Sequence, residues 1–158
     1  MSRTGIGFDS HRLAEGRRLI IGGVSIPSPL GLDGHSDADV LAHAVTDALL
    51  GAAGLGDIGE HFPDTDERWR DADSIELLRQ VVGMLERDGL RIENVDCTVV
   101  MEQPRLAPHR AAIRQSLARA LGVAGERVNV KASTGERMGF IGRGEGVVAL
   151  AVASVTEG

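Results

Sequence analysis

The sequence predicts an α+β sandwich, in which helices pack on one face of a mixed β-sheet. Segments that alternate like strands are interleaved with segments of helical periodicity, and two short strand-like segments read as a hairpin. The chain has 158 residues, 42% of them hydrophobic, and shows no repeat, low-complexity tract or linker. These observations predict one domain, residues 1–158, around a single core.

The strand-like segments occur near both ends and in the middle of the chain. A hairpin is expected where two apolar segments flank Gly22 and Gly23, because paired glycines suit tight hairpin turns. The expected strands are residues 3–9, the hairpin within 18–27, 91–102, 127–133 and 146–155.

Three helices are expected, at about 36–54, 74–87 and 107–123. In the first, Ser36 reads as the N-cap, with Asp39 as the third residue of a capping box, and Gly54 ends the helix. Its buried face is expected to consist of Leu41, Ala44, Val45, Ala48, Leu49 and Ala52. Between these elements lie two long loops, 55–73 and 134–146, and long loops in small domains are often functional.

Composition excludes several classes of protein. A net charge of −6 without a basic stripe argues against a nucleic-acid partner, and no apolar run is long enough to span a membrane. The N-terminus lacks the pattern of a signal peptide, so we expect a cytoplasmic protein. Cys97 is the only cysteine, which rules out an intrachain disulfide, and its strand-like surroundings predict a buried, inert thiol.

Three side chains form a candidate metal site. Asp9 and His11 lie two apart on a predicted strand and therefore point to the same side. His43 lies on the following helix, off its apolar face, with Asp39 and Asp47 four residues before and after it. Either acid could accept the second imidazole N–H. One aspartate and two histidines with a fourth position open is the pattern of a functional zinc site; the alternative is exposed or core-satisfied histidines.

Two further segments could bind phosphate. His35 and Ser36 lie at the predicted start of the first helix, where free N–H groups favour anions, although Ser36 could be only a cap. The glycine-rich segment 131–146 carries Lys131, Thr134, Glu136 and Arg143, and such a loop could serve a diphosphate, with Glu136 as a ligand for Mg²⁺. The alternative for that segment is a surface connection between strands.

Taken together, these stretches resemble one family over nearly the whole chain. The stretches are "GFDSH", "GLDGHSDADVLAHAVTDALLGAAGLGDIGEHFPDTD", "ADS", "NVD", "QPRLAPH", "VNVKAST" and, after Glu136, "MGFIGRGEG". In order and spacing they are similar to the 2-C-methyl-D-erythritol 2,4-cyclodiphosphate synthase family, and residues 34–66 are the most specific part.

The resemblance implies a ferredoxin-like α+β subunit that assembles as a homotrimer around a central, sheet-lined axis. The implied substrate is 4-diphosphocytidyl-2-C-methyl-D-erythritol 2-phosphate, an intermediate of the non-mevalonate isoprenoid pathway. Its 2-phosphate attacks the β-phosphorus, CMP leaves, and a cyclic diphosphate forms. The nucleophile is already an ionised phosphate, so catalysis consists of aligning two anions and neutralising their charge.

The resemblance also assigns roles to residues. It implies zinc on Asp9, His11 and His43, with a substrate phosphate oxygen as the fourth ligand, and magnesium or manganese on Glu136. It implies that His35 and Thr134 stabilise the transition state and that Ser36 binds phosphate. The implied erythritol-binding residues are Asp57, Ile58, Gly59, Phe62, Pro63, Asp64, Thr65 and Asp66. A neighbouring subunit would supply the cytidine-binding residues Met101, Pro104, Arg105, Leu106, Ala107, Ala132, Ser133 and Thr134, with Gly135 beside them.

Three positions depart from the usual residues of the family, and four others are assigned to a cavity on the trimer axis. Arg105 stands where lysine is common and Ser133 where threonine is usual. Gly135 replaces a side chain, which is expected to loosen the loop before Glu136. The implied axial cavity, which could hold an isoprenoid diphosphate, would be lined by Phe8, Phe140, Arg143 and Glu145.

Two other functions fit the same residues. In a zinc-dependent phosphohydrolase, metal-bound water would replace the internal phosphate as nucleophile. In a non-catalytic isoprenoid-diphosphate-binding trimer, the axial cavity would be the functional site.

Overall fold

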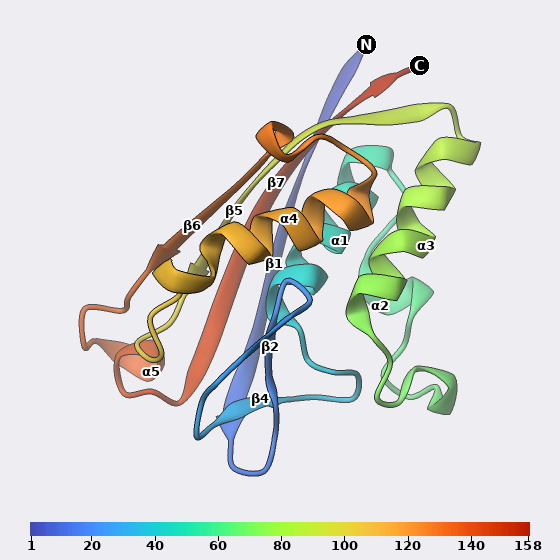
Figure 1. Cartoon of the computed structure of the whole chain (residues 1–158). Coiled ribbons are helices and arrows are strands. Elements are labelled where there is room, and N and C mark those ends of the chain that lie inside the picture. The colour runs from blue at the N-terminus through green and yellow to red at the C-terminus, as the bar shows by residue number, and fades with distance from the viewer.

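A computed structural model describes residues 1–158 and contains a five-stranded mixed sheet in the order β4-β1-β7-β5-β6 (Figure 1). The strands are β1 (Ser2–Ala14), β2 (Leu19–Ile21), β3 (Val24–Ile26), β4 (Gly31–Asp33), β5 (Leu90–Val100), β6 (Val128–Ser133) and β7 (Gly146–Glu157). The helices are α1 (Val40–Ala53), α2 (Ile58–His61), α3 (Ser74–Arg87), α4 (Arg110–Leu121) and α5 (Gly139–Gly142), with single 3₁₀ turns η1 (Glu67–Trp69), η2 (Ala107–His109) and η3 (Gly125–Arg127).

The sheet confirms the predicted mixed α+β architecture. β7 lies between β1 and β5 and is antiparallel to both, while β5 and β6 are parallel. β1 is longer than the predicted strand 3–9, because it pairs with β7 from Ser2 opposite Thr156 to Arg12 opposite Gly146. The expected hairpin is also present: β2 and β3 pair across Gly22 and Gly23, both at positive φ.

Two glycines of β1 allow α1 to lie directly on the sheet. A Cβ atom placed on Gly5 would come within 2.1 Å of the Ala48 carbonyl oxygen, and one on Gly7 within 1.8 Å of the Ala44 carbonyl oxygen. No other residue type permits this approach. The buried face of α1 contains all six predicted residues, so the prediction from helical spacing was correct.

The predicted start of the first helix was wrong. α1 begins at Val40, and its N-cap is Asp39 rather than Ser36. The fully buried Asp39 carboxylate accepts N–H groups of Ala42 (3.0 Å), Gly22 (2.8 Å) and Gly23 (2.6 Å), so it joins the hairpin to the helix. Burial raises the pKa of Asp39 to about 6. Because these carboxylate contacts take up the N–H of Ala42, the helix start is less suited to an anion than expected.

The core lies between the sheet and its helices. α1 packs on β1 and β7, and α4 packs on β6. Cys97 of β5 is buried there as predicted, and burial raises the pKa of its thiol to about 12. Such a thiol is unreactive at neutral pH. No helix in the structure combines the length and the apolar character needed to cross a membrane.

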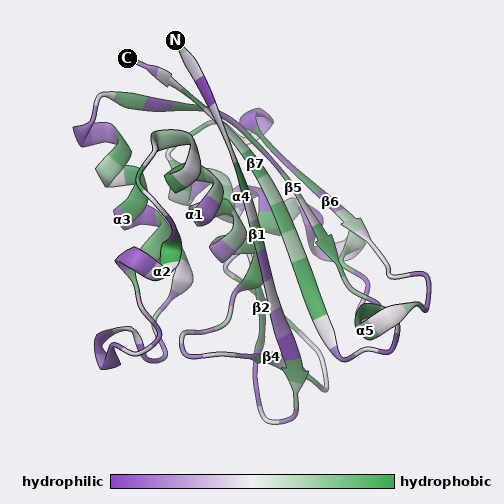
Figure 2. Cartoon of the chain, turned by 180° about the vertical axis from the view of Figure 1, so that it is seen from behind, coloured by the Kyte–Doolittle hydropathy of each residue, from purple (hydrophilic) through white to green (hydrophobic).

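The other face of the sheet is uncovered except at one end, where the four-residue helix α5 places Phe140 against Gly146 of β7. In Figure 2, β1, β7, β5 and β6 lie in front of α1 and α4. Four apolar side chains of β1 and β7 are exposed on this face and face one another as cross-strand pairs: Ile6 (70% exposed) opposite Val152 (41%), and Phe8 (60%) opposite Leu150 (38%). A contiguous apolar patch of this kind is typical of a surface that is covered by another chain.

Candidate metal centre and active site

Asp9, His11 and His43 meet where β1 passes the first turns of α1. The Asp9 Oδ2 atom lies 2.9 Å from His11 Nε2 and 3.0 Å from His43 Nδ1, and the two nitrogen atoms are 3.2 Å apart. Asp9 and His11 follow Gly5 and Gly7 on the same side of β1, which is the side against which α1 packs. The glycines therefore bring the helix close enough for His43 to reach the strand.

The three atoms fit a metal ion. They form a nearly equilateral triangle on the cavity wall, and their side chains retain exposed fractions of 14% to 28%. A tetrahedral zinc ion with bonds of about 2.0–2.2 Å would hold its ligand atoms about 3.3 Å apart, slightly wider than this triangle. A carboxylate and two imidazoles also match the ligand preference of zinc, and one coordination position would remain open.

The charges of the three side chains are coupled. Burial works to raise the pKa of Asp9, but hydrogen bonds from His11 and His43 outweigh burial and lower this pKa to about 2. Burial works to lower the pKa of His11, and the hydrogen bond with Asp9 outweighs burial and raises it. A bound cation would take the place of the imidazole proton in balancing the Asp9 charge.

The prediction that Asp39 or Asp47 accepts the second imidazole N–H of His43 was wrong. Asp39 binds the hairpin and the helix start, as described, and Asp47 accepts the backbone N–H of Ile58 at 3.0 Å. The Nε2 atom of His43 instead lies 2.8 Å from Ser74 Oγ and 3.2 Å from Ser36 Oγ. Spacing on one helix could not reveal this partner, because Ser74 comes from the start of α3.

A cavity of about 520 Å³ opens beside the triad. His35 and Ser36 line it together with five of the eight predicted erythritol-binding residues. Those five are Ile58, Gly59, Phe62, Pro63 and Asp64. Sequence reasoning missed Gly34, Trp69 and Leu77, which also line this cavity; the apolar, helical spacing of Leu77 in α3 was the only available signal.

The other three predicted erythritol-binding residues lie outside this lining. The Asp57 carboxylate accepts the N–H of Glu60 and caps α2, and Thr65 lies on the following turn. The Asp66 side chain pairs with Arg68, whose hydrogen bonds lower the pKa of Asp66, while the Asp66 carbonyl accepts His35 Nε2 at 2.9 Å. Asp66 thus acts on the cavity through its backbone, by orienting His35.

Trp69 forms part of the cavity wall. Its ring meets Phe62 edge to face, with centroids 5.0 Å apart, and the Arg68 guanidinium lies 5.3 Å from its centroid. Its indole N–H is buried without a hydrogen-bond partner. The loop 55–73, which was expected to be irregular, holds this aromatic pair through α2 and η1.

A second cavity, also of about 520 Å³, lies at the far edge of the sheet. It is lined by residues that the family resemblance assigns to cytidine and the second metal: Met101, Pro104, Arg105, Leu106, Ala107, Ala132, Ser133, Thr134 and Glu136. Glu102 and Gln103 line it as well and belong to the 101–107 segment that the resemblance assigns to cytidine. Arg110 and Arg137 also line it and were missed, because nothing in their spacing sets them apart.

The loop before Glu136 is not loosened by Gly135. The Gly135 N–H donates to Glu102 Oε1 at 2.5 Å, and a Cβ on Gly135 would lie 2.9 Å from the Gly142 nitrogen. Glu136 and Arg137 follow at φ of 52° and 62°, a left-handed geometry that is uncommon for side-chain-bearing residues. A glycine therefore fits this tight turn.

Lys131 does not belong to the glycine-rich loop. Its Nζ atom pairs with Asp96 across β5 and β6, at 2.7 Å. Farther along, Arg143 pairs with Glu145 at 3.0 Å. A smaller hollow of about 240 Å³ is lined by Phe140 and Glu145 with Ser10, His11, Arg12 and Gly146.

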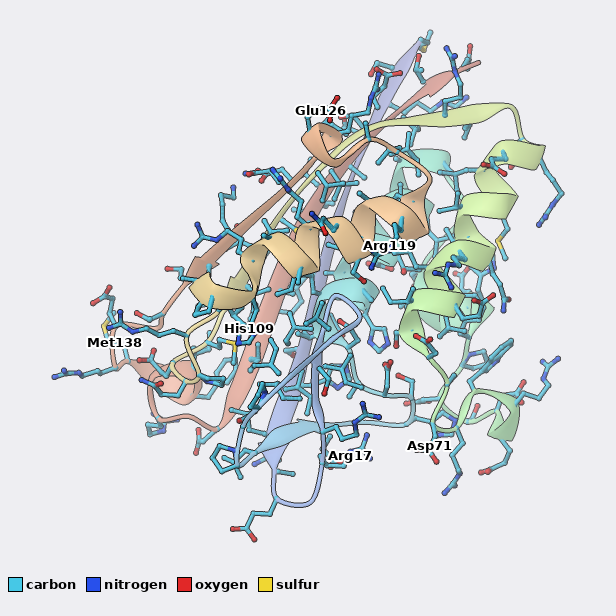
Figure 3. All side chains as sticks on the ribbon, viewed as in Figure 1. Arg17, Asp71, His109, Arg119, Glu126 and Met138 are labelled. Carbon is cyan, nitrogen blue, oxygen red and sulfur yellow. The ribbon has the colours of Figure 1, made fainter.

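These two cavities of about 520 Å³ share no lining residue and lie toward opposite edges of the sheet. β1 and β6 are separated by β7 and β5, and three strand spacings amount to about 14 Å. Figure 3 shows the same division: Met138, in the loop of the second cavity, extends from one side of the molecule, and Asp71, next to the first, lies on the other. One chain alone therefore does not bring the two sets of residues together.

Comparisons with known proteins agree with the fold and the site. The model of the YgbB family matches residues 2–156. The 2-C-methyl-D-erythritol 2,4-cyclodiphosphate synthase of Syntrophomonas wolfei is 57% identical over 155 residues, covering 98% of this chain and 99% of its own. The synthase of the same name from Methylobacillus flagellatus is 60% identical over 152 residues, covering 96% and 95%.

Solved structures are similar over the whole chain. A 2C-methyl-D-erythritol-2,4-cyclodiphosphate synthase bound to CDP is 42% identical with a TM-score of 0.90, covering 98% of this chain and 100% of its own. The bifunctional IspDF of Campylobacter jejuni is 44% identical with a TM-score of 0.97, and this chain covers 43% of that longer protein. By sequence and by structure, the chain belongs to the YgbB family.

Proposed function

We propose that the chain is a 2-C-methyl-D-erythritol 2,4-cyclodiphosphate synthase of the non-mevalonate isoprenoid pathway. Its substrate would be 4-diphosphocytidyl-2-C-methyl-D-erythritol 2-phosphate, which yields the cyclic diphosphate and CMP. The observation that carries this proposal is the triangle of Asp9, His11 and His43 on a cavity wall. The same cavity is lined by His35, Ser36, Ile58, Gly59, Phe62, Pro63 and Asp64. A fourth coordination position on that triangle would face a phosphate.

Two metal sites belong to the proposal. Asp9, His11 and His43 would hold zinc, and Glu136 would hold magnesium or manganese. When bound, these ions supply positive charge to the phosphates of the substrate. No lysine or arginine lines the first cavity, so a zinc ion there would supply positive charge that the side chains do not.

The chain's own side chains would position the substrate. His35 donates through Nε2 to the Asp66 carbonyl, so only its imidazolium form would have an Nδ1–H to donate to a phosphate oxygen; the Ser36 hydroxyl lines the same wall. Phe62, Pro63 and Trp69 give an apolar wall for the methylerythritol part, and they would help exclude water from the reacting phosphates. No general base is needed, because the attacking phosphate is ionised.

We also propose that each active site is completed by a second copy of the chain, in a homotrimer. The second cavity contains Arg105, Thr134 and Glu136, and would supply the nucleotide-binding half of the site. Two observations support this assembly: the cavities lie at opposite sheet edges, and the apolar residues Ile6, Phe8, Leu150 and Val152 are exposed on the uncovered face. In such a trimer, Phe8 and Phe140 would lie near an axial cavity that could accept an isoprenoid diphosphate.

The deciding experiment is phosphorus NMR of the product formed from the diphosphocytidyl substrate. The proposal predicts CMP and a cyclic diphosphate in equal amounts. Running the reaction in oxygen-18 water separates the alternatives, because attack by the internal phosphate places no solvent oxygen in the product. An open-chain product carrying oxygen-18 would identify a phosphohydrolase and overturn the proposal.

A further inference from the structure

Ser74 and Asp37 form a buried chain of hydrogen bonds behind His43. Ser74 Oγ lies 2.8 Å from His43 Nε2 and 2.5 Å from Asp37 Oδ1. Ser74 is fully buried at the first residue of α3 and does not line the metal cavity. Its role therefore has to be exerted through His43.

The segment that carries Asp37 is joined to the segment that carries Ser74 by backbone hydrogen bonds. The Asp37 N–H donates to the Ala72 carbonyl at 3.0 Å, and the Asp71 N–H donates to the His35 carbonyl at 2.8 Å. The Asp37 carboxylate also accepts the backbone N–H groups of Ser74 and Asp39, both at 3.1 Å. These contacts fix the position of the carboxylate.

The protons in this chain can be placed by counting donors. A carboxylate accepts only, so the single proton of the Ser74 hydroxyl lies toward Asp37. Ser74 Oγ can then only accept from His43, which places the imidazole proton on Nε2. A bound metal would replace the proton through which Nδ1 hydrogen-bonds to Asp9 at 3.0 Å. With the other proton held on Nε2, the lone pair of Nδ1 would then face Asp9 and His11, which is the direction from which the metal would bind.

The orientation of His11 is fixed by a single backbone group. Its Nδ1 donates to the Asp33 carbonyl at 2.9 Å, which leaves Nε2 for the metal. A carbonyl can only accept, whereas a serine hydroxyl can donate or accept. The Ser74 hydroxyl can therefore act as a pure acceptor toward His43, as the Asp33 carbonyl does toward His11, only because Asp37 takes up its proton.

Ser36 is the weaker partner. Its hydroxyl is 3.2 Å from His43 Nε2 and accepts the Ala38 N–H at 3.2 Å. It also lines the cavity and lies 3.4 Å from Ser74 Oγ, so its proton can point to Ser74 or to a ligand. The shorter contact and the carboxylate behind it make Ser74 the main acceptor.

We propose that Asp37 and Ser74 are positioning residues, which hold His43 with its proton on Nε2 and present Nδ1 to the metal. This inference rests on the metal site of the proposed function and adds two residues to it. The pair gives a role to the "ADS" stretch at 72–74, which none of the substrate or metal assignments includes.

The test measures zinc binding directly and does not depend on turnover. Metal-stripped wild type, Ser74→Ala and Asp37→Asn are titrated with zinc against a chromophoric chelator. Loss of an outer partner of a ligating histidine typically weakens metal binding by about 10–100-fold, and we expect this loss in both variants. Their cobalt-substituted forms should show shifted visible absorption bands, because the His43 ring is less firmly oriented.

Thr46→Val is the matched control. Thr46 is fully buried on α1 and donates to the Ala42 carbonyl at 2.7 Å, so the variant also loses a buried hydroxyl but keeps the Ser74 contact. It should bind zinc like wild type and keep the wild-type cobalt spectrum.

The outcomes separate this inference from the proposed function. Wild-type zinc affinity and an unchanged cobalt spectrum in Ser74→Ala would overturn the inference alone. If Ser74→Ala does not fold, Asp37→Asn decides by the same two measurements. Absence of zinc binding by the wild type would overturn both the metal site and its positioning pair, while a non-cyclic product from a zinc-binding enzyme would overturn only the proposed function.

Discussion

The two large cavities have the same volume, but their polar groups are held in different ways. In the first, each imidazole that faces the triad has its outer nitrogen bonded within the chain, to the Asp33 carbonyl or to Ser74. In the second, Arg105, Arg110 and Arg137 lie on the wall, and none of the three forms an ion pair within the chain, whereas seven other arginines do. The first cavity is organised within one chain, and the second has charges that are free to meet a partner or ligand.

This difference indicates that, in the proposed site, the first cavity binds the metal and the second binds the nucleotide. A metal requires several ligand atoms fixed within a few tenths of an ångström, which a single folded chain provides best. A nucleotide can be bound by cations and backbone groups at the rim of an assembly. Metal binding and catalysis should therefore respond differently to changes in assembly.

The largest expected effect comes from mixing two inactive variants. His43→Ala and Glu136→Gln should each lose at least about 10²-fold in activity, because each disables one half of the site. Co-assembled in equal amounts, they should recover about a quarter of wild-type activity, the chance that both halves of a site between two copies are intact. Steady-state assays on the mixed assembly check this.

Mixing two variants of the same half is the control for that experiment. Asp9→Asn with His43→Ala should recover no activity, because every site then carries a defective triad. Recovery in this control, or none in the first mixture, would contradict a site shared between copies.

The next effect separates assembly from metal binding. Ile6→Glu places a charge on the uncovered apolar face and should leave a folded monomer. We expect activity to fall by at least about 10²-fold, because the nucleotide half is no longer held in place. Zinc affinity should stay near wild type, since the triad lies within one chain. Analytical ultracentrifugation and zinc titration give the two readouts.

Gln115→Glu adds the same charge to the exposed surface of α4 and serves as the comparison. It should remain assembled and active. Loss of zinc binding in Ile6→Glu while the fold is retained would show that the first cavity also depends on a neighbour.

A smaller effect tests how the first cavity is built. Gly7→Ala would place a methyl group 1.8 Å from the Ala44 carbonyl oxygen and should lower the free energy of unfolding by about 1–3 kcal/mol, because α1 must move off β1. Zinc affinity should fall with it, since His43 precedes Ala44. Gly51→Ala on α1 meets no atom closer than 3.7 Å and should be neutral or stabilising. Thermal unfolding and zinc titration compare the two.

The smallest effect concerns pH. The His11 pKa is raised above 6.5, so its contribution to metal-free stability is present below pH 6.5 and lost as pH rises through the folded-state pKa. The Asp9 pKa is lowered from 3.8 to about 2, so its contribution is present above pH 4 and lost only near pH 2. Metal-free protein should therefore lose stability from this cluster as the pH rises above 6.5.

Zinc-loaded protein should show the opposite trend in that range. The ion competes with the His11 proton, so its affinity rises with pH. The difference in Tm between zinc-loaded and chelator-treated protein should grow by about 3 °C per pH unit if one proton is displaced. Differential scanning calorimetry at pH 6, 7 and 8 measures it, and a constant difference would contradict the displacement of a proton.

Local rules predicted the elements and the triad. Residues two apart on a strand share a side, and His43 lies off the apolar face of its helix, so the convergence of Asp9, His11 and His43 could be expected. The start of α1 was misplaced because Asp39 caps it while binding Gly22 and Gly23, a contact that depends on where the hairpin lies.

The tertiary contacts could not be read from spacing. Asp47 lies four residues from His43, yet it binds Ile58, and the partner that His43 does have comes from another helix. The link between 34–37 and 71–74 joins two segments without periodicity. The order of the strands, which separates the two cavities, could not be read from spacing and was not predicted.

The position of Trp69 has an optical consequence. The chain contains one tryptophan and no tyrosine, so nearly all of its near-ultraviolet emission arises from a single ring. That ring stands in the wall of the first cavity, in contact with Phe62 and beside the Arg68 guanidinium. The unlabelled protein thus carries its own fluorophore at the place where the methylerythritol part would bind, and filling of that half of the site can be followed in real time by emission, separately from events at the nucleotide-binding edge.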